Sequence, residues 1–289
     1  MACSRPLLII SIILVLGFLI CGIFLGYMFI RDVSRDSFDD TFLPKNCWEI
    51  RDQAVTEESF VQIEDNYTIF PTRDAAHPVY VSCEMEQEGG GWTVIQRRGF
   101  RNPVSFSDKT WTDYKKGFGT AGTNYWLGLD NIHALTRNRD QELWVSSIQT
   151  VHSSVNGKYS GSFEADNGMI FKRFWIEDEA NLYRVHFLDG VPMGRGGEDY
   201  RYFYKINGQP FSTKDVDNTD NPDAACHKER YPFVERRHIG GWWFQNSTCE
   251  AGTNLNWEPR TPSSLQIFFP GSGNRRPDKI LMRIRTATE

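Results

Sequence analysis

An uncharged run of 24 residues, Leu7–Ile30, is the feature that most restricts how this chain can be arranged. As an α-helix the run would rise about 36 Å, which is enough to cross the roughly 30 Å hydrocarbon core of a bilayer with some tilt. A helix buried in a soluble core would carry a polar stripe, and this run has none. The alternative is a cleaved signal peptide, but its apolar region is usually only about 7–15 residues long. We therefore predict an uncleaved membrane anchor, with a secreted form as the alternative if the segment is cut.

The cysteines beyond the anchor decide on which side of the membrane the rest of the chain lies. The flanking arginines do not, because they occur both before the run and after it: Arg5, Arg31 and Arg35. An even number of cysteines without a CxxC pair, after a membrane-targeting segment, indicates two disulfides in an oxidising compartment. Four cysteines allow three pairings, and the spacing favours the two sequential ones, Cys47–Cys83 and Cys226–Cys249. We predict a single-pass type II protein of the plasma membrane with an extracellular C-terminal domain.

Two sequons agree with an extracellular domain. Asn66-Tyr67-Thr68 and Asn246-Ser247-Thr248 predict N-linked glycans on Asn66 and Asn246.

The formal net charge of −5 argues against a nucleic-acid-binding protein, because a chain with this balance does not attract a polyanion.

The chain divides into four parts: a cytosolic tail (1–6), the anchor (7–30), an acidic stalk (31–45) and one domain (46–289). The stalk has no heptad pattern and predicts no coiled coil, so a homo-oligomer would have to form through the anchor or the domain. Short runs rich in β-branched and aromatic residues predict strands, at Val79–Met85, Trp92–Arg98, Glu142–Ile148, Met169–Ile176, Tyr183–Leu188 and Ile280–Ile284. Short helices are expected at Trp111–Phe118 and Asn131–Thr136. The segment from Gly190 to Pro277 is expected to be built of loops, where binding sites usually lie.

One of these segments, VYVSCEMEQEGGGWTVIQRR (Val79–Arg98), resembles the signature of the fibrinogen C-terminal domain family. Further motifs of that family follow in order: WTDYKKGFG (Trp111–Gly119), YWLGLDNIHALT (Tyr125–Thr136), FST-x-D-x-DN (Phe211–Asn218), GGWWF (Gly240–Phe244) and LMRIR (Leu281–Arg285). The resemblance covers about residues 46–285, and the family includes fibrinogen chains, ficolins, tachylectins, angiopoietins and tenascins.

The resemblance implies an α+β fold, with a small N-terminal disulfide lobe, a central mostly antiparallel sheet and a loop-rich lobe that binds calcium and ligand. It also implies the sequential disulfide pairing and a final strand, Ile280–Ile284, inserted into the central sheet. The sequence departs from the family pattern in several places. The segment 150–168 is longer than usual, HKERYPFVERRH is inserted between Cys226 and Cys249, and Glu250 replaces a histidine. LNW replaces a glycine run, and the stretch from there to Ile280 is shortened.

Alternating oxygen donors in the segment 215–221 are the best candidate for a calcium site, because calcium takes roughly six to eight oxygen ligands. The segment is not an EF-hand, since neither the glycine nor the final glutamate of that loop is present. By resemblance, Asp215 and Asp217 would supply carboxylates, and Thr219 and Asn221 backbone carbonyls. An acidic, solvated turn is the alternative. The calcium would fix the loop that carries the binding pocket.

The resemblance places a ligand pocket around Cys249. In ficolin-like and tachylectin-like members an acetyl group enters an aromatic cleft there, often beside a cis peptide bond, which here would be Thr248–Cys249. Fibrinogen's own pocket takes a peptide amino terminus instead, and Glu250 would favour such a cationic partner. Tyr231, in the insertion, either lines this pocket or is an exposed loop aromatic. The two tryptophans of GGWWF are expected in the core.

No HExxH, GxSxG, Walker or GxGxxG pattern occurs in the chain, so we predict that it is not an enzyme. We predict a cell-surface recognition protein that binds an extracellular ligand through the calcium-supported loop lobe, with an acetylated glycan as one candidate. The alternative is an adhesion or signalling ligand for a protein receptor.

Overall fold

The computed structural model describes residues 42–56, 64–99, 104–155, 158–194, 203–219, 240–244, 254–256 and 278–287. The chain forms two units, Met1–Leu43 and Pro44–Glu289. The predicted anchor lies outside the described residues, and none of the helices that are described is long and apolar enough to cross a bilayer. The anchor and the extracellular location therefore stay predictions.

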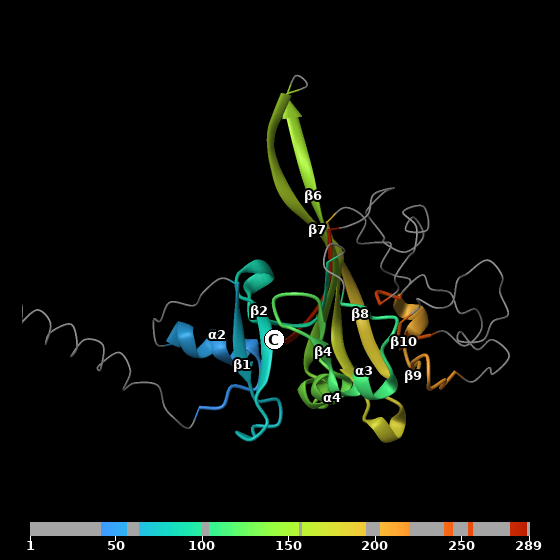
Figure 1. Ribbon diagram of the computed structural model, residues 1–289. Helices are drawn as coiled ribbons and strands as arrows, with labels where there is room; N and C mark the ends of the chain where they lie inside the picture. The colour runs from blue at the N-terminus through green and yellow to red at the C-terminus, as the bar shows by residue number, and fades with distance from the viewer. Residues whose placement is uncertain are drawn as a thin grey trace, which may run out of the picture. The chain divides into compact units, whose positions relative to one another are not determined.

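Nine strands of the described part form one antiparallel sheet (Figure 1). The order along the sheet is β1-β2-β3-β11-β6-β7-β8, with β5 joined to β3 and β4 to β5. The strands are β1 (Glu64–Ile69), β2 (Val79–Glu84), β3 (Trp92–Gly99), β4 (Phe118–Gly119), β5 (Tyr125–Trp126), β6 (Gln141–Val155), β7 (Lys158–Ile176), β8 (Val185–Met193) and β11 (Lys279–Thr286). The predicted antiparallel sheet is confirmed, and every predicted strand overlaps one of these elements.

The predicted insertion of the final strand is also confirmed. β11 pairs with β3 on one side and with β6 on the other, antiparallel in both cases. Ile280, Met282 and Ile284 alternate along the strand, and each is 1% exposed within the main hydrophobic core. A strand between two neighbours has its backbone amides and carbonyls paired on both edges, so β11 joins the two halves of the sheet.

A smaller cluster of Trp92, Trp144 and Ile170 is separate from the main core. Two arginines of β11 stack on its rings: the Arg283 guanidinium lies 3.8 Å from the Trp144 centroid, and that of Arg285 lies 4.2 Å from the Trp92 centroid. Such cation–π contacts are strongest where water is excluded, and Arg283 is 1% exposed. The cluster therefore holds β11 through its charged side chains as well as its apolar ones.

The N-terminal lobe contains the predicted disulfide between Cys47 and Cys83, which is confirmed with a Cα–Cα distance of 5.7 Å. It joins the first residue of helix α2 (Cys47–Thr56) to β2. The sequence did not predict α2, because the helix has no apolar stripe. Its start is fixed by Asn46, whose side-chain oxygen accepts the backbone amide of Glu49 at 3.0 Å.

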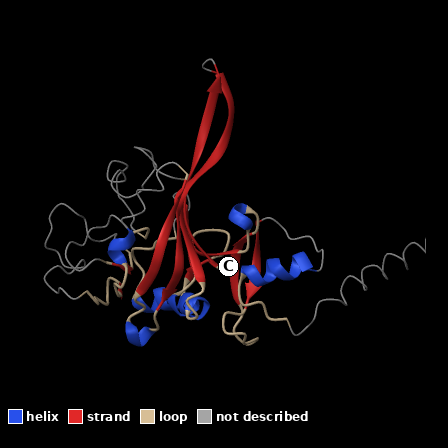
Figure 2. Ribbon diagram, turned by 180° about the vertical axis from the view of Figure 1, so that it is seen from behind, coloured by secondary structure: helices blue, strands red, loops and turns tan. Residues whose placement is uncertain are grey.

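Helices α3 (Trp111–Lys116) and α4 (Leu129–Thr136) contact each other, and α4 also contacts β7 (Figure 2). Thr110 begins α3 with a capping box to Asp113. The helix was predicted to extend to Phe118 but ends at Lys116, because Gly117 has a positive φ of 94°.

Tyr183 was predicted to begin β8, and this was wrong by two residues. Leu182 and Tyr183 have positive φ values of 59° and 48°, which extended backbone does not allow, so the strand begins at Val185.

β6 and β7 continue as a two-stranded hairpin beyond the rest of the sheet (Figures 1 and 2). The pairing of β11 with β6 starts at Ile148, opposite Lys279. Beyond Ile148, β6 pairs with β7 alone, from Gln149↔Ala165 to Val155↔Lys158. Residues 150–155 and 158–165, from the segment predicted to be longer than usual for the family, form this hairpin. From the sequence, strands had been predicted to end at Ile148 and to begin at Met169.

Candidate calcium and ligand site

The loop that follows β9 (Phe211–Ser212) carries the residues predicted to bind calcium. β9 pairs with β10 (Trp242–Trp243) in a separate two-stranded sheet. The loop turns back at Thr213, whose backbone amide donates to the Val216 carbonyl at 2.8 Å. Its far end is tied to β9 by Asn218, whose side-chain amide donates to the Phe211 carbonyl at 2.7 Å. The segment 213–219 is thus held in place by its own hydrogen bonds.

Asp215 connects this loop to the start of α3. Its Oδ1 accepts the backbone N–H of Trp111 at 2.9 Å and the hydroxyl of Thr213 at 2.8 Å. The N–H of Trp111 is one of the helix-terminal amides that have no partner within the helix, and a negative charge is favourable there. Asp215 therefore has a structural role, whether or not it binds a cation.

Among the residues that the structure describes, Asp217 bonds only within its own turn. Its Oδ1 accepts the backbone N–H of Thr219 at 3.0 Å and the hydroxyl of the same residue at 2.7 Å. Asp215 and Asp217 are both exposed, and within the described part of the chain the Oδ2 atom of neither accepts a hydrogen bond. Each carboxylate thus keeps one oxygen for a cation, and hard oxygen donors of this kind fit calcium.

An aromatic cluster beneath the loop explains why β9 is fixed. The Phe211 ring lies 5.0 Å from Trp243, 5.2 Å from Tyr114 and 6.0 Å from Trp126, measured between centroids. These side chains are at most 1% exposed, and so is Trp242. The expectation that both tryptophans of GGWWF belong to the core is confirmed. Because Tyr114 is on α3 and Trp126 is on β5, the cluster joins the loop to the body of the domain.

A charged group beside α3 was missed by the sequence analysis. Glu179, in the 3₁₀ turn η2 (Glu179–Asn181), accepts the indole N–H of Trp111 at 3.0 Å and also pairs with Lys115. The hydrogen bond from Lys115, followed by that from Trp111, lowers the pKa of the Glu179 carboxyl, and the same ion pair raises the pKa of Lys115. These residues lie more than one element apart in sequence, so no local pattern indicated that they meet.

Several predicted site residues lie outside the described part of the chain, and their roles stay predictions: Asn221, Tyr231, Thr248, Cys249, Glu250, the second disulfide Cys226–Cys249, and the sequon at Asn246. The described half of the site contains Asp215, Asp217 and Thr219 on one short loop.

Comparison with known proteins decides the family. A sequence model described as "Fibrinogen beta and gamma chains, C-terminal globular domain" matches residues 44–260. The chain belongs to the fibrinogen C-terminal domain family. This family assignment agrees with the disulfide lobe, the antiparallel sheet and the inserted β11 described above.

Fibrinogen-related proteins similar to this chain include a lectin by name. Techylectin-5A of Tachypleus tridentatus is 37% identical over 177 residues, which are 61% of this chain and 51% of that protein. Microfibril-associated glycoprotein 4 of Bos taurus is 37% identical over 219 residues, 74% of this chain and 78% of that protein. This chain thus spans about half the length of techylectin-5A. Among solved structures, the fibrinogen-like globe domain of human ANGPTL6 is 28% identical with a TM-score of 0.63, covering 88% of this chain and all of that one.

Proposed function

We propose that this protein is a non-catalytic, extracellular recognition or adhesion protein of the cell surface, whose fibrinogen-like domain binds its ligand beside a calcium-supported loop. The observation that carries the proposal is the pair of exposed carboxylates, Asp215 and Asp217, on a loop that is hydrogen-bonded to α3 and to β9. Membership of a family whose relatives include a lectin by name supports recognition over catalysis.

Calcium would be held by the carboxylates of Asp215 and Asp217 and by the carbonyls of Thr219 and Asn221. A bound divalent cation supplies fixed positive charge, which would hold the two carboxylates close together. The chain's own contribution is to set the loop before the cation arrives, because one oxygen of each carboxylate is already occupied by protein hydrogen bonds. The ligand pocket would then lie around Cys249, with an acetylated glycan as the first candidate ligand.

A protein receptor is the second candidate, and one observation favours it. Leu188 and Val191 on β8 are 42% and 49% exposed, and Tyr204 is 40% exposed. Leu188 and Val191 pair with Lys172 and Ile170 and so share one face of the sheet, whereas Tyr204 packs on Phe171 and Phe187 on the other face. An exposed apolar pair like Leu188 and Val191 is typical of a protein-contact surface.

The deciding experiment measures binding of the full chain on cells to N-acetylglucosamine and glucosamine, each on the same polymer, with calcium or with a chelator. Asp217→Ala is the test variant, and Asp74→Ala, an exposed aspartate outside the loop, is the matched control. Acetyl-selective binding that is lost on chelation and in Asp217→Ala would support the lectin hypothesis. Failure of the folded, calcium-loaded chain to bind either polymer would contradict it and favour the protein receptor.

A further inference from the structure

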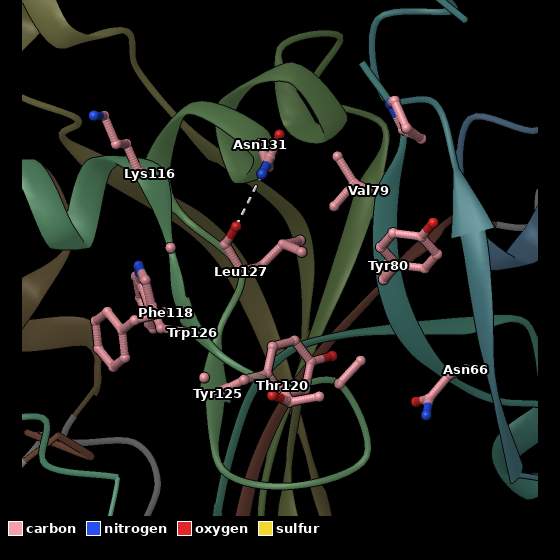
Figure 3. A pocket seen from close by; sticks show the side chains of 14 residues that line it. Asn66, Val79, Tyr80, Lys116, Phe118, Thr120, Tyr125, Trp126, Leu127 and Asn131 are labelled. Atoms are coloured by element: carbon pink, nitrogen blue, oxygen red, sulfur yellow. Dashed lines mark hydrogen bonds between the residues drawn. The ribbon is translucent and has the colours of Figure 1, made fainter. Parts of the chain in front are cut away.

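A groove of about 520 Å³ lies between the N-terminal lobe and the β4–β5 segment, and none of the calcium-loop residues 213–219 lines it (Figure 3). Its floor includes the buried residues Tyr125, Trp126 and Leu127. The Tyr125 hydroxyl already bonds to backbone groups: it donates to the Val94 carbonyl and accepts the backbone amide of Ser82 at 3.4 Å. The floor is therefore mainly apolar, whereas the rim is exposed.

Asn66 and Tyr80 form one wall of the groove (Figure 3). The antiparallel register of β1 and β2 pairs Asn66 with Ser82 and Thr68 with Tyr80. Directly paired residues share a sheet face, and so do residues two apart, so Asn66 and Tyr80 are diagonal neighbours on one face. Tyr80 is 69% exposed, which is unusual for an aromatic residue beside a preformed groove.

We infer that Asn66 carries an N-linked glycan and that the first sugars of this glycan pack in the groove against the Tyr80 ring. Asn66 is the first residue of the sequon Asn66-Tyr67-Thr68, and its side chain is exposed. The apolar face of a pyranose ring, made of C–H groups, packs well on an aromatic ring. The glycan therefore covers the Tyr80 ring, which is otherwise in water.

The side-chain amide of Asn66 lies against the turn that borders the groove. Gly122, with φ +81°, lies so close to Asn66 that a Cβ there would be 3.2 Å from its Oδ1 and 3.3 Å from its Nδ2. The amide that bears the glycan thus rests against the turn at Thr120–Thr123, which is closed by a backbone hydrogen bond of 3.0 Å. Lys116 and Asn131 also line the groove and carry N–H donors, although one N–H of the Asn131 amide is already bonded to the Leu127 carbonyl at 2.9 Å (Figure 3).

This inference rests on the extracellular placement in the proposed function, and the two are tested separately. The full chain is produced in a eukaryotic secretory cell line, and mass spectrometry reads both the glycan at Asn66 and the Cys47–Cys83 disulfide. Release of the glycan from the folded protein by a peptide N-glycosidase is then timed. We compare the parent chain with Tyr80→Ala and with Val191→Ala, a control that truncates an exposed apolar side chain (49%, against 69% for Tyr80) that does not line the groove.

We expect Asn66 to be occupied, and removal of the Tyr80 ring to speed glycan release about five-fold, with no change for Val191→Ala. An unmodified Asn66 in a chain whose Cys47–Cys83 disulfide has formed would overturn the inference and leave the proposed function intact. The groove would then be free to bind a separate ligand or a second copy of the chain. Equal release rates for the parent and Tyr80→Ala would overturn the packing. Absence of both glycan and disulfide would refute the extracellular placement itself.

Discussion

Removing the Cys47–Cys83 disulfide should destabilise the domain by about 5 kcal/mol. The bond closes a loop of 36 residues. For that loop length the loss of unfolded-state entropy is about 12.8 cal/mol/K, or about 3.8 kcal/mol at 25 °C. Replacing both cysteines by alanine also removes two sulfur atoms from positions that are 0% and 1% exposed, which we estimate at roughly 0.8 kcal/mol each by analogy with a buried methylene group. The total approaches the whole stability of a marginal domain, which is about 5–15 kcal/mol.

The assay is equilibrium unfolding in urea, followed by tryptophan fluorescence, for the parent chain, the double alanine variant and the parent chain after reduction. Reduction of the parent chain also breaks the predicted Cys226–Cys249 bond, so the same measurement is made on a Cys226→Ala/Cys249→Ala chain, where reduction should lower the free energy of unfolding by about 3.8 kcal/mol. If the free energy of unfolding of the Cys47→Ala/Cys83→Ala variant falls by less than about 1 kcal/mol, the reasoning is refuted. Such a result would mean that other contacts hold α2 against β2 as firmly as the disulfide does.

Three further outcomes are expected. Arg283→Lys should lower the free energy of unfolding by about 1–2 kcal/mol, because an ammonium cannot stack on the Trp144 ring as the guanidinium does; an unchanged thermal midpoint would contradict this. Hydrogen bonds from the Thr110 backbone and hydroxyl hold the pKa of the Asp113 carboxyl below its ordinary value. Its stabilising contribution is thus present above the ordinary pKa and lost as the pH falls below about 4, so Asp113→Asn should weaken the acid dependence of the melting temperature, and parallel curves for the two proteins would count against it. Asp217→Ala should abolish calcium binding in a titration with little loss of stability, because its hydrogen bonds stay within one turn; unchanged calcium affinity would exclude Asp217 as a ligand.

Much of the sheet was predictable because its strands carry their signal locally. The alternating apolar residues of β11 and the aromatic and β-branched residues of β3 predicted strands directly. The strand β1, EDNYTI, is too polar to be recognised, and it forms because β2 offers an edge along its whole length. The β6–β7 hairpin extends through a polar segment for the same reason, since each strand supplies the other's hydrogen-bond partners.

For the candidate site, the motif located Asp215 and Asp217 but not what surrounds them. The contact between Asp215 and the backbone of Trp111 joins residues 104 positions apart, and the Glu179 carboxylate reaches the same tryptophan from a third segment. Single residues of common types carry no periodic signal, so such contacts follow only from the packed fold. The dual role of Asp215, in structure and as a predicted calcium ligand, could not be inferred without it.

The position of β11 has a consequence for how the domain is made. The strand lies between β3, which ends at Gly99, and β6, which ends at Val155, yet it begins only at Lys279. At a synthesis rate of roughly 5–20 residues per second, β3 and β6 wait about 6–36 s with one edge unpaired. Such edges are templates for pairing with other chains. The sheet therefore closes only when the end of the domain has been made, and loss of β11 should lead to aggregation rather than to a smaller folded domain.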